Sequence, residues 1–174
     1  MSITLIPIFI LPIGVLIIAA SIDTKGVGLF FQNRVGQYGK VFTIIKIRTF
    51  NETGEVSKYS AIIRKYKLDE FPQLFNILVG QMSFVGPRPD VKGYADKLKG
   101  DHRKILKLRP GITGPASIKF INEELLLSKQ ENPKYYNDNV IYPEKVRINL
   151  DYFYNNSIWI DFKIIFATIF RISN

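Results

Sequence analysis

One stretch decides how the rest of the sequence is interpreted: Lys67-Leu68-Asp69-Glu70-Phe71-Pro72-Gln73-Leu74. Proline is well tolerated at the first position of a helix, where its missing N–H would have no partner. We therefore expect a helix over about 72–79 that ends at Gly80. Asp69 and Glu70 would then lie beside the positive end of that helix, which stabilises anions and metal-bound phosphate groups. Taken alone, the stretch is more typical of an ordinary charge pair at a helix start, so the other segments have to decide its role.

The composition limits the classes of function. With 174 residues, the chain suits one compact domain with appendages. Its formal charge of +9 favours an acidic partner such as nucleic acid, an anionic membrane surface or a phosphorylated substrate. There are no cysteines, which excludes disulfides, zinc–thiolate sites and thiol nucleophiles. The single histidine, His102, is interpreted as a surface residue in a basic run, and neither GxGxxG nor GxxxxGKS/T occurs.

An uncharged apolar run extends from Ile3 to Ala20. Its length of about 18 residues meets the usual threshold for a transmembrane helix. No basic segment precedes it, which argues against a secretory signal peptide. A straight span and a re-entrant hairpin kinked near Pro12 both stay open, because proline removes a helical hydrogen bond. The strongly basic chain that follows keeps the main domain in the cytoplasm with either geometry.

Two apolar segments, 29–32 and 41–46, are separated by a turn-rich stretch and predict a β-hairpin. Lys46 and Arg48 close the second strand on one face, since side chains alternate along a strand. Such a cation pair suits a diphosphate, and an exposed polar strand face explains it equally well. Arg64, in a short predicted helix, is expected to lie beside Asp69.

Two loops braced by proline and glycine carry further arginines. Arg88 lies between Pro87 and Pro89, and Arg109 opens a second loop that also contains the hydroxyl of Thr113. Guanidinium groups bind phosphate through two hydrogen bonds, so both loops are candidate phosphate sites, although a structural role is the commoner one.

Two further segments are expected to be helical. Residues 91–108 are basic, which fits either a solvated face or contact with anionic lipid headgroups. Residues 159–171 are apolar and aromatic, which fits an interfacial helix or a helix packed on the core. The predicted fold is therefore α+β and mainly helical, with a small β-hairpin and amphipathic interfacial helices.

Taken together, these segments resemble the bacterial sugar transferases known as monotopic phosphoglycosyl transferases. The resemblance covers about residues 12–172, with five motifs in the family's order. Residues 31–36, together with Phe30 before them, look like F-x-Q-x-R-x-G, and residues 46–50 like K-F-R/K-T-M. Residues 64–74 resemble R-x-x-x-L-D-E-x-P-Q-L, residues 76–89 resemble N-V/I-L-x-G-x-M-S-F/L-x-G-P-R-P, and residues 109–114 read R-P-G-I-T-G. Each string is weak by itself, whereas five in order are highly specific.

The resemblance implies transfer of a sugar 1-phosphate from a nucleotide sugar, usually a UDP-sugar, to a polyprenol phosphate such as undecaprenyl phosphate. It makes Asp69 the nucleophile of a covalent aspartyl-phosphosugar intermediate, formed as UMP leaves, and Glu70 its assisting carboxylate. A carboxylate is a competent phosphoryl acceptor but must approach a polyanion. Mg²⁺ held at Asp69 and Glu70 would offset that repulsion. The expected phosphate- and substrate-binding residues are Lys46, Arg48, Arg64, Arg88, Arg109 and Thr113.

The resemblance also implies a location. Residues 1–22 would form a membrane-inserted, re-entrant helix kinked at Pro12, and residues 23–174 a catalytic domain on the cytoplasmic face of the bacterial inner membrane. Membrane lipids are then partners, nucleic acid is not, and a homo-oligomer stays open. The product would enter a surface glycan such as capsule, lipopolysaccharide or exopolysaccharide at its first membrane step.

Several positions depart from the family's pattern. Leu11 replaces the serine that usually precedes the kink proline, so that side chain's hydrogen bond is not available there. The basic residues usually found before the membrane segment are absent, which suggests a chain that begins late or was trimmed. Ser60 stands where glycine is common. Residues 115–149 are longer than in the smallest members and resemble a subgroup with G-P-A-S-I-K, which suggests a different sugar preference.

Two other functions compete with this interpretation. An inactive or regulatory membrane-bound homologue would bind nucleotide sugar or lipid phosphate without releasing UMP. A basic nucleic-acid binder fits the charge alone and would bind oligonucleotides in a salt-sensitive way, but it gives no reason for the two adjacent carboxylates.

Overall fold

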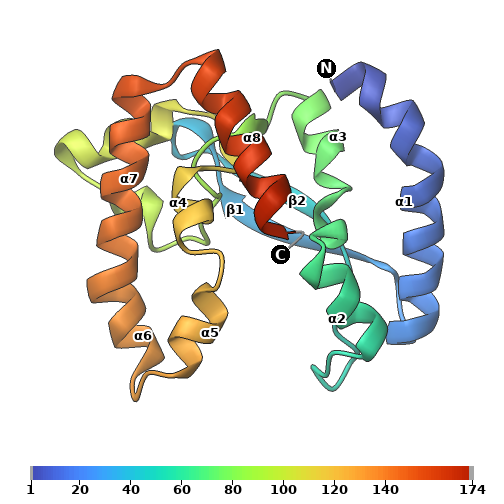
Figure 1. The fold of residues 1–174 in the computed structure, drawn as a ribbon. Helices are drawn as coiled ribbons and strands as arrows, with labels where there is room; N and C mark the ends of the chain where they lie inside the picture. The colour runs from blue at the N-terminus through green and yellow to red at the C-terminus, as the bar shows by residue number, and fades with distance from the viewer. Residues whose placement is uncertain (1, 173–174) are drawn as a thin grey trace. The chain divides into compact units, whose positions relative to one another are not determined.

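The computed structural model describes residues 2–172, with side chains described for residues 11–170. The chain divides into two compact units, each described by itself. The first unit comprises residues 2–34, 41–82 and 172, and the second comprises residues 35–40 and 83–171. Figure 1 labels their main helices and strands.

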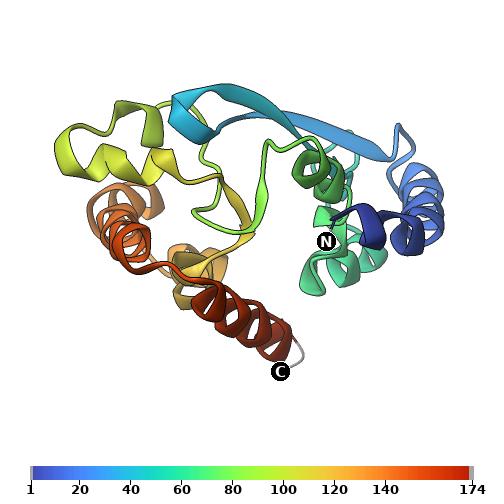
Figure 2. The ribbon, with the colours of Figure 1, turned by 90° about the horizontal axis from the view of Figure 1, so that it is seen from above.

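The first unit combines three helices with a hairpin. Its elements are α1 (Ser2–Thr24), β1 (Leu29–Val35), β2 (Val41–Ile47), α2 (Lys58–Lys65), the 3₁₀ turn η2 (Leu68–Glu70) and α3 (Gln73–Leu78). β1 and β2 form a two-stranded sheet and run side by side in Figure 2. The predicted hairpin is confirmed, with strands slightly longer than expected.

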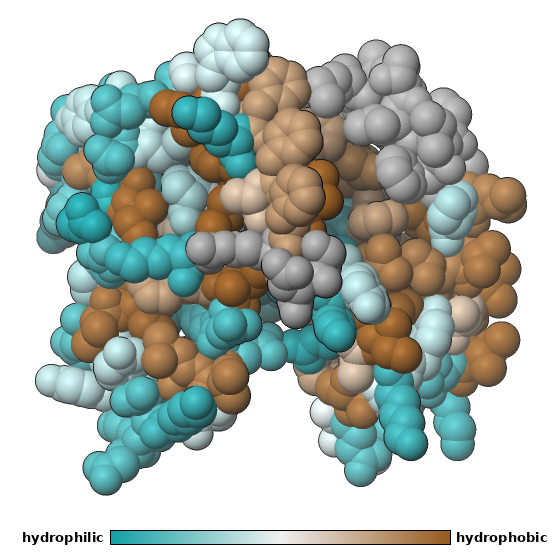
Figure 3. Space-filling model, viewed as in Figure 1, coloured by the Kyte–Doolittle hydropathy of each residue, from teal (hydrophilic) through white to brown (hydrophobic). Residues whose placement is uncertain are grey.

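Helix α1 is apolar on two opposite faces. Ile13 and Ala20 are buried where α1 contacts α2, α3 and β2. The opposite face exposes a stripe of large apolar side chains, and Figure 3 shows brown side chains along this helix. The stripe consists of Leu11, Val15, Ile18 and Ile22.

Helix α1 passes through Pro12, where the sequence predicts a kink. The helix continues through Pro12 without ending, and its ribbon in Figure 1 is not straight, as expected where proline removes a hydrogen bond. Among the residues that the structure describes, none of the helices has both the length and the apolar character needed to cross a membrane. The re-entrant course stays a prediction.

Polar contacts attach the end of α1 to α2. The hydroxyls of Ser57 and Ser60 both donate to Asp23 Oδ2, each at 2.7 Å. Ser57 also caps α2, because its Oγ accepts a hydrogen bond from the backbone N–H of Ser60. Ser60, which departs from the family's pattern, is thus part of this attachment.

The helix expected after Pro72 is present but short. Pro72 has helical dihedrals and precedes α3, and Gly80 follows with φ of +79°, so both predicted ends are close to the observed ones. Asp69 and Glu70 directly precede this helix, as expected, and they lie in a 3₁₀ turn.

The second unit is built mainly from short helices. Its elements are η1 (Gln37–Gly39), β3 (Ser83–Val85), η3 (Ala95–Lys97), η4 (Gly100–Lys107), β4 (Gly111–Thr113), α4 (Pro115–Lys119), α5 (Glu123–Ser128), α6 (Pro133–Tyr136), the π-helix η5 (Asn137–Ile141), α7 (Tyr142–Asn155) and α8 (Ile158–Ile172). The basic stretch 91–108 is not the single helix that was expected. Gly93 and Gly100 have φ of +104° and +56°, and two 3₁₀ segments result.

Helix α8 fits both of the interpretations offered for it. Ile164 is buried with Val85 and Tyr152, and Ile160 and Ile165 pack against that cluster. Its other face exposes large apolar or aromatic side chains, and Figure 3 shows tan atoms along this helix. They are Ile158, Trp159, Phe162, Phe166, Ile169 and Phe170.

Candidate active site

The two predicted catalytic carboxylates lie in one tight turn whose entry is conformationally unusual. Lys67, directly before η2, has φ of 56° and ψ of 22°, in the left-handed region. A residue with a Cβ adopts this conformation at a cost of about 1–2 kcal/mol, and such positions gather at functional sites. The turn is closed by a hydrogen bond of 3.2 Å from the Glu70 N–H to the Lys67 carbonyl. The chain therefore reverses at Lys67 and presents Asp69 and Glu70 on consecutive residues.

Glu70 is buried in an ion pair. Its Oε1 lies 3.3 Å from Lys46 Nζ, and the two side chains are 4% and 16% exposed. A buried carboxylate is tolerated only when paired, so Lys46 fixes the position of Glu70. Asp69 is only partly buried. Of the two carboxylates, Glu70 is thus the internal one, and the structure brings the predicted Lys46 to it directly.

The other two predicted phosphate-binding residues of this unit, Arg48 and Arg64, lie in or directly after elements that contact the turn. Both β2 and α2 contact η2. Arg48 follows β2, where its backbone N–H donates to the Gly28 carbonyl at 2.8 Å, and its Nε is buried without a hydrogen-bond partner in the described part of the chain. Arg64 lies in the last turn of α2, with its guanidinium 4.8 Å from the centre of the Phe50 ring. Stacking on an aromatic face orients a guanidinium without using its hydrogen-bond donors.

Two buried polar residues of this unit, both in α3, were not among the candidates of the sequence analysis. Asn76 is 3% exposed and ties α3 to β2: its Nδ2 donates to the Thr43 carbonyl at 2.8 Å, and its Oδ1 accepts from the Ile45 N–H at 3.3 Å. Gln73 is 2% exposed. The signal was present, because Glu70, Gln73 and Asn76 recur every three residues among apolar neighbours.

The remaining predicted residues, Arg88, Arg109 and Thr113, belong to the second unit, so the structure does not group them with Asp69 within one unit. Their two loops are brought together by the parallel pair β3–β4, in which Ser83 is opposite Gly111 and Val85 is opposite Thr113. Hydrogen bonds extend the pair from Gly86 N–H to the Thr113 carbonyl and from Gly111 N–H to the Pro87 carbonyl, each at 2.9 Å. This pairing was not predicted.

The two arginines and the threonine differ in exposure. Arg88 and Arg109 are exposed next to the paired segments. Thr113 is 8% exposed, and its hydroxyl shares a hydrogen bond of 2.6 Å with that of Thr168 in α8. Thr113 therefore has a packing role in this unit, and its contact with substrate stays a prediction.

Metal binding can be judged from the donors present. No group of three or more His, Asp or Glu side chains is gathered as a metal site within residues 2–172. Mg²⁺ in phosphoryl-transfer sites is usually held by one or two carboxylates together with substrate phosphates, so it does not need such a group. Asp69 and Glu70 supply two adjacent hard oxygen donors and in that respect fit Mg²⁺.

A separate hollow of about 480 Å³ lies in the second unit. Tyr94 and Tyr142 form part of its wall, with ring centres 4.9 Å apart, and Lys97, Lys134 and Asp138 complete its polar lining. Tyr94 donates to Asp138 at 2.8 Å, which raises the pKa of Tyr94 and lowers that of Asp138. None of the predicted site residues lines this hollow.

Comparison with known proteins identifies the family. A model described as "Bacterial sugar transferase" matches residues 1–174. The chain is 35% identical to a UDP-glucose:undecaprenyl-phosphate glucose-1-phosphate transferase of Klebsiella pneumoniae, over 97% of this chain and 37% of that protein. It is 31% identical to a UDP-N-acetylgalactosamine-undecaprenyl-phosphate N-acetylgalactosaminephosphotransferase of Aeromonas hydrophila, over 85% and 36%. A UDP-glucose:undecaprenyl-phosphate glucose-1-phosphate transferase of Caulobacter vibrioides is 30% identical over 87% and 59%.

These relatives are longer proteins, and the chain spans little more than a third of the first two. The match with the family nevertheless extends over the whole sequence and includes the turn that holds Asp69 and Glu70. The chain belongs to the bacterial sugar transferase family.

Proposed function

We propose that this chain transfers a sugar 1-phosphate from a UDP-sugar to undecaprenyl phosphate and releases UMP. The names of its relatives support this class of substrates. The observation that carries the proposal is the buried Lys46–Glu70 ion pair, which holds a turn presenting a second carboxylate, Asp69, next to it. An ordinary charge pair at a helix start would be exposed to solvent and would not enclose its carboxylate.

The proposed reaction has two displacements at one phosphorus. A carboxylate oxygen of Asp69 attacks the phosphorus that carries the sugar, a new P–O bond forms, and the P–O bond to the departing UMP breaks. An aspartyl phosphosugar remains. A phosphate oxygen of undecaprenyl phosphate then attacks the same phosphorus, the bond to Asp69 breaks, and the carboxylate is restored.

Cationic side chains make this approach of anions feasible. Lys46 offsets the negative charge of Glu70, so Glu70 repels the diphosphate of the substrate less than it would without the lysine. Arg48 and Arg64 supply guanidinium groups on elements that contact the turn, where they stabilise charge that develops on the transferred phosphoryl group. When bound at Asp69 and Glu70, Mg²⁺ supplies further positive charge to the diphosphate.

A lipid-borne acceptor requires contact with the membrane surface. The exposed apolar stripe of α1 and the exposed aromatic face of α8 suit such contact, because neither face is covered by the described part of its own unit. We propose that residues 1–22 enter the membrane along the α1 stripe and turn back near Pro12. The excess of basic residues after this segment favours the cytoplasmic face.

UMP release tests the reaction. The chain in detergent or nanodiscs is incubated with undecaprenyl phosphate, Mg²⁺ and, in turn, UDP-glucose, UDP-galactose and UDP-N-acetylgalactosamine. We expect one donor to release UMP, and Asp69→Asn to lower the rate by about a thousandfold or more, as for loss of other nucleophiles. Asp151→Asn, an exposed carboxylate on α7, is the matched control and should keep the full rate.

Intact mass tests the covalent step. With donor and no acceptor, the wild type should gain the mass of one phosphosugar, and hydroxylamine should remove it. Full activity or the same adduct in Asp69→Asn would disprove the role of Asp69. No UMP from any donor would favour an inactive homologue that only binds nucleotide sugar.

A further inference from the structure

A buried row of polar side chains begins at the residue that follows the proposed nucleophile. Glu70, Gln73 and Asn76 are 4%, 2% and 3% exposed. Phe71 and Pro72, which join η2 to α3, both have right-handed helical dihedrals, so the backbone is helical from residue 68 to residue 78. Residues three apart lie on one face of such a segment. We call these three residues the polar row.

Strand β2 holds both ends of the polar row. Glu70 pairs with the Lys46 side chain, and Asn76 bonds the backbone of Thr43 and Ile45. The row therefore faces β2, with Gln73 between two residues that are fixed to it. Gln73 differs from both, because its Nε2 is buried and has no hydrogen-bond partner in the described part of the chain.

An unpartnered buried amide donor is rare, since buried donors almost always find an acceptor. Arg48, two residues after Lys46, also has a buried Nε without a partner within residues 2–172. Arg48 thus follows one member of the Lys46–Glu70 ion pair by two residues, and Gln73 follows the other member by three. Two donors that lack acceptors are complementary to a ligand that only accepts hydrogen bonds, as a fully ionised phosphate does.

We propose that Gln73 donates a hydrogen bond from Nε2 to a phosphate oxygen of a substrate bound at Asp69. This inference rests on the proposed function, in which both substrates carry phosphate. A neutral donor suits this position, because a lysine or arginine beside buried Glu70 would pair with that carboxylate instead of the ligand. Gln73 is then a substrate-contacting residue, and Asn76 is its structural counterpart in the same row.

Gln73→Met and Asn76→Leu form a matched pair of tests, because each replaces an amide side chain by an apolar side chain of similar size and so removes its hydrogen bonding. Without ligand, we expect Gln73→Met to melt at the wild-type temperature or above, since it removes a donor that has no protein acceptor. Asn76→Leu should melt lower, because it leaves groups of β2 unpaired. With donor and acceptor present, Gln73→Met should lower the rate of UMP release by about 10- to 100-fold, as expected for one bond to a charged oxygen.

Two titrations distinguish the source of the phosphate. If Gln73 contacts the nucleotide diphosphate, Gln73→Met weakens binding of UDP about tenfold or more and leaves the KM for undecaprenyl phosphate unchanged. If it contacts the lipid phosphate, that KM rises and UDP binding is unchanged. Either result supports the proposal.

The proposal is overturned in two ways. Gln73→Met could melt as low as Asn76→Leu, which would mean that the amide is part of the internal hydrogen bonding. It could also release UMP at the wild-type rate. If the wild type releases no UMP from any donor, the proposed function fails by itself, and calorimetric titration with pyrophosphate decides about Gln73. Binding that is tenfold weaker in Gln73→Met supports the contact, and equal or absent binding in both proteins overturns it.

Discussion

The turn that carries Asp69 and the loops that carry Arg88 and Arg109 are held in place by different forces. In the first, polar side chains do the positioning, with a buried ion pair at Glu70 and amide hydrogen bonds at Asn76. In the second, backbone pairs with backbone, and glycines allow the close approach. In a site positioned by charged side chains, the ion pairs can rearrange when a charged ligand binds. In a site where glycines let two backbone segments pack closely, the segments keep one arrangement. This difference fits the proposed role of Asp69 as the reacting group and the predicted role of the two loops as a fixed phosphate site.

The largest effect on stability should come from adding one methyl group between the loops. A Cβ at Gly111 would overlap with Gly86 N and with the Thr113 carbonyl oxygen, so β3 and β4 could not stay paired. We expect Gly111→Ala to lower the free energy of unfolding by about 3 kcal/mol or more. Gly26→Ala is the control, because its Cβ would meet only the Thr24 carbonyl oxygen at 3.9 Å and should change stability by less than about 0.5 kcal/mol. Denaturant unfolding measures both, and a Gly111→Ala protein as stable as wild type would mean that glycine sterics do not hold these loops.

A smaller loss of stability should follow from removing the positive charge of Lys46 beside the turn. Lys46→Met leaves Glu70 buried without its lysine, which should cost about 2–3 kcal/mol, less than for a fully buried pair because Lys46 is 16% exposed. UMP release should fall as well. Adding Glu70→Gln removes the charge of the buried carboxylate, so the double variant should regain part of the stability but not the activity. A double variant less stable than Lys46→Met would contradict the ion pair as the force that holds the turn.

The sequence predicted elements whose signals are local. The hairpin followed from two apolar segments around a turn, and the end of α3 followed from Gly80. The two carboxylates were expected together because they are adjacent in the chain. For these features, the residues that determine the structure lie within one or two turns of each other.

Features set by distant segments were not predicted. β3 and β4 have three residues each and are separated by a long stretch, so no periodicity marks them as partners. Residues 91–108 were expected to be helical from their charges, but Gly93 and Gly100 adopt positive φ there and divide them. Gln73 and Asn76 were not among the predicted site residues. Their spacing is visible in the sequence, but only the position of β2 shows that this polar face is buried.

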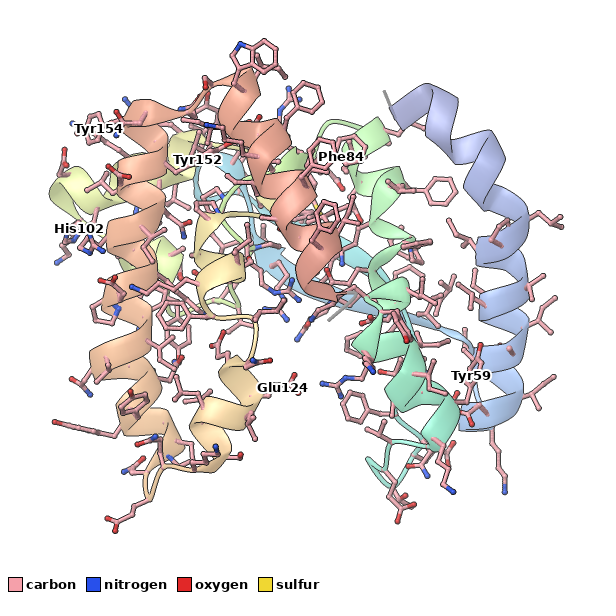
Figure 4. All side chains as sticks on the ribbon, in the orientation of Figure 1. Tyr59, Phe84, His102, Glu124, Tyr152 and Tyr154 are labelled. Carbon is pink, nitrogen blue, oxygen red and sulfur yellow. The ribbon has the colours of Figure 1, made fainter. Side chains whose placement is uncertain are left out.

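Two tyrosines offer a finer comparison of the units, and Figure 4 labels both. Tyr152 in α7 donates to Asp161 Oδ1 in α8, whereas the hydroxyl of Tyr59 in α2 is buried with no hydrogen-bond partner in the described part of the chain. Tyr152→Phe should lower the free energy of unfolding by about 1–2 kcal/mol, since a carboxylate loses a donor. Tyr59→Phe should change it by less than about 0.5 kcal/mol. Equal losses in both variants would show that Tyr59 has an internal partner.

The smallest expected effect is a change in how the free energy of unfolding depends on pH in alkaline solution. Burial raises the pKa of Tyr59, assisted by the charge of Asp23, and burial with the hydrogen bond to Asp161 raises the pKa of Tyr152 further. In the unfolded chain both phenols ionise near pH 10. Because the folded state keeps its protons longer, the contribution of each phenol to stability is complete below pH 10 and is lost as pH rises towards the folded-state pKa. Free energies of unfolding between pH 9 and 11 should therefore fall with pH in the wild type, less steeply in Tyr59→Phe and least steeply in Tyr152→Phe. If Tyr152→Phe keeps the wild-type slope, contact with Asp161 does not keep that phenol protonated, and the difference between the two tyrosines does not extend to their titration.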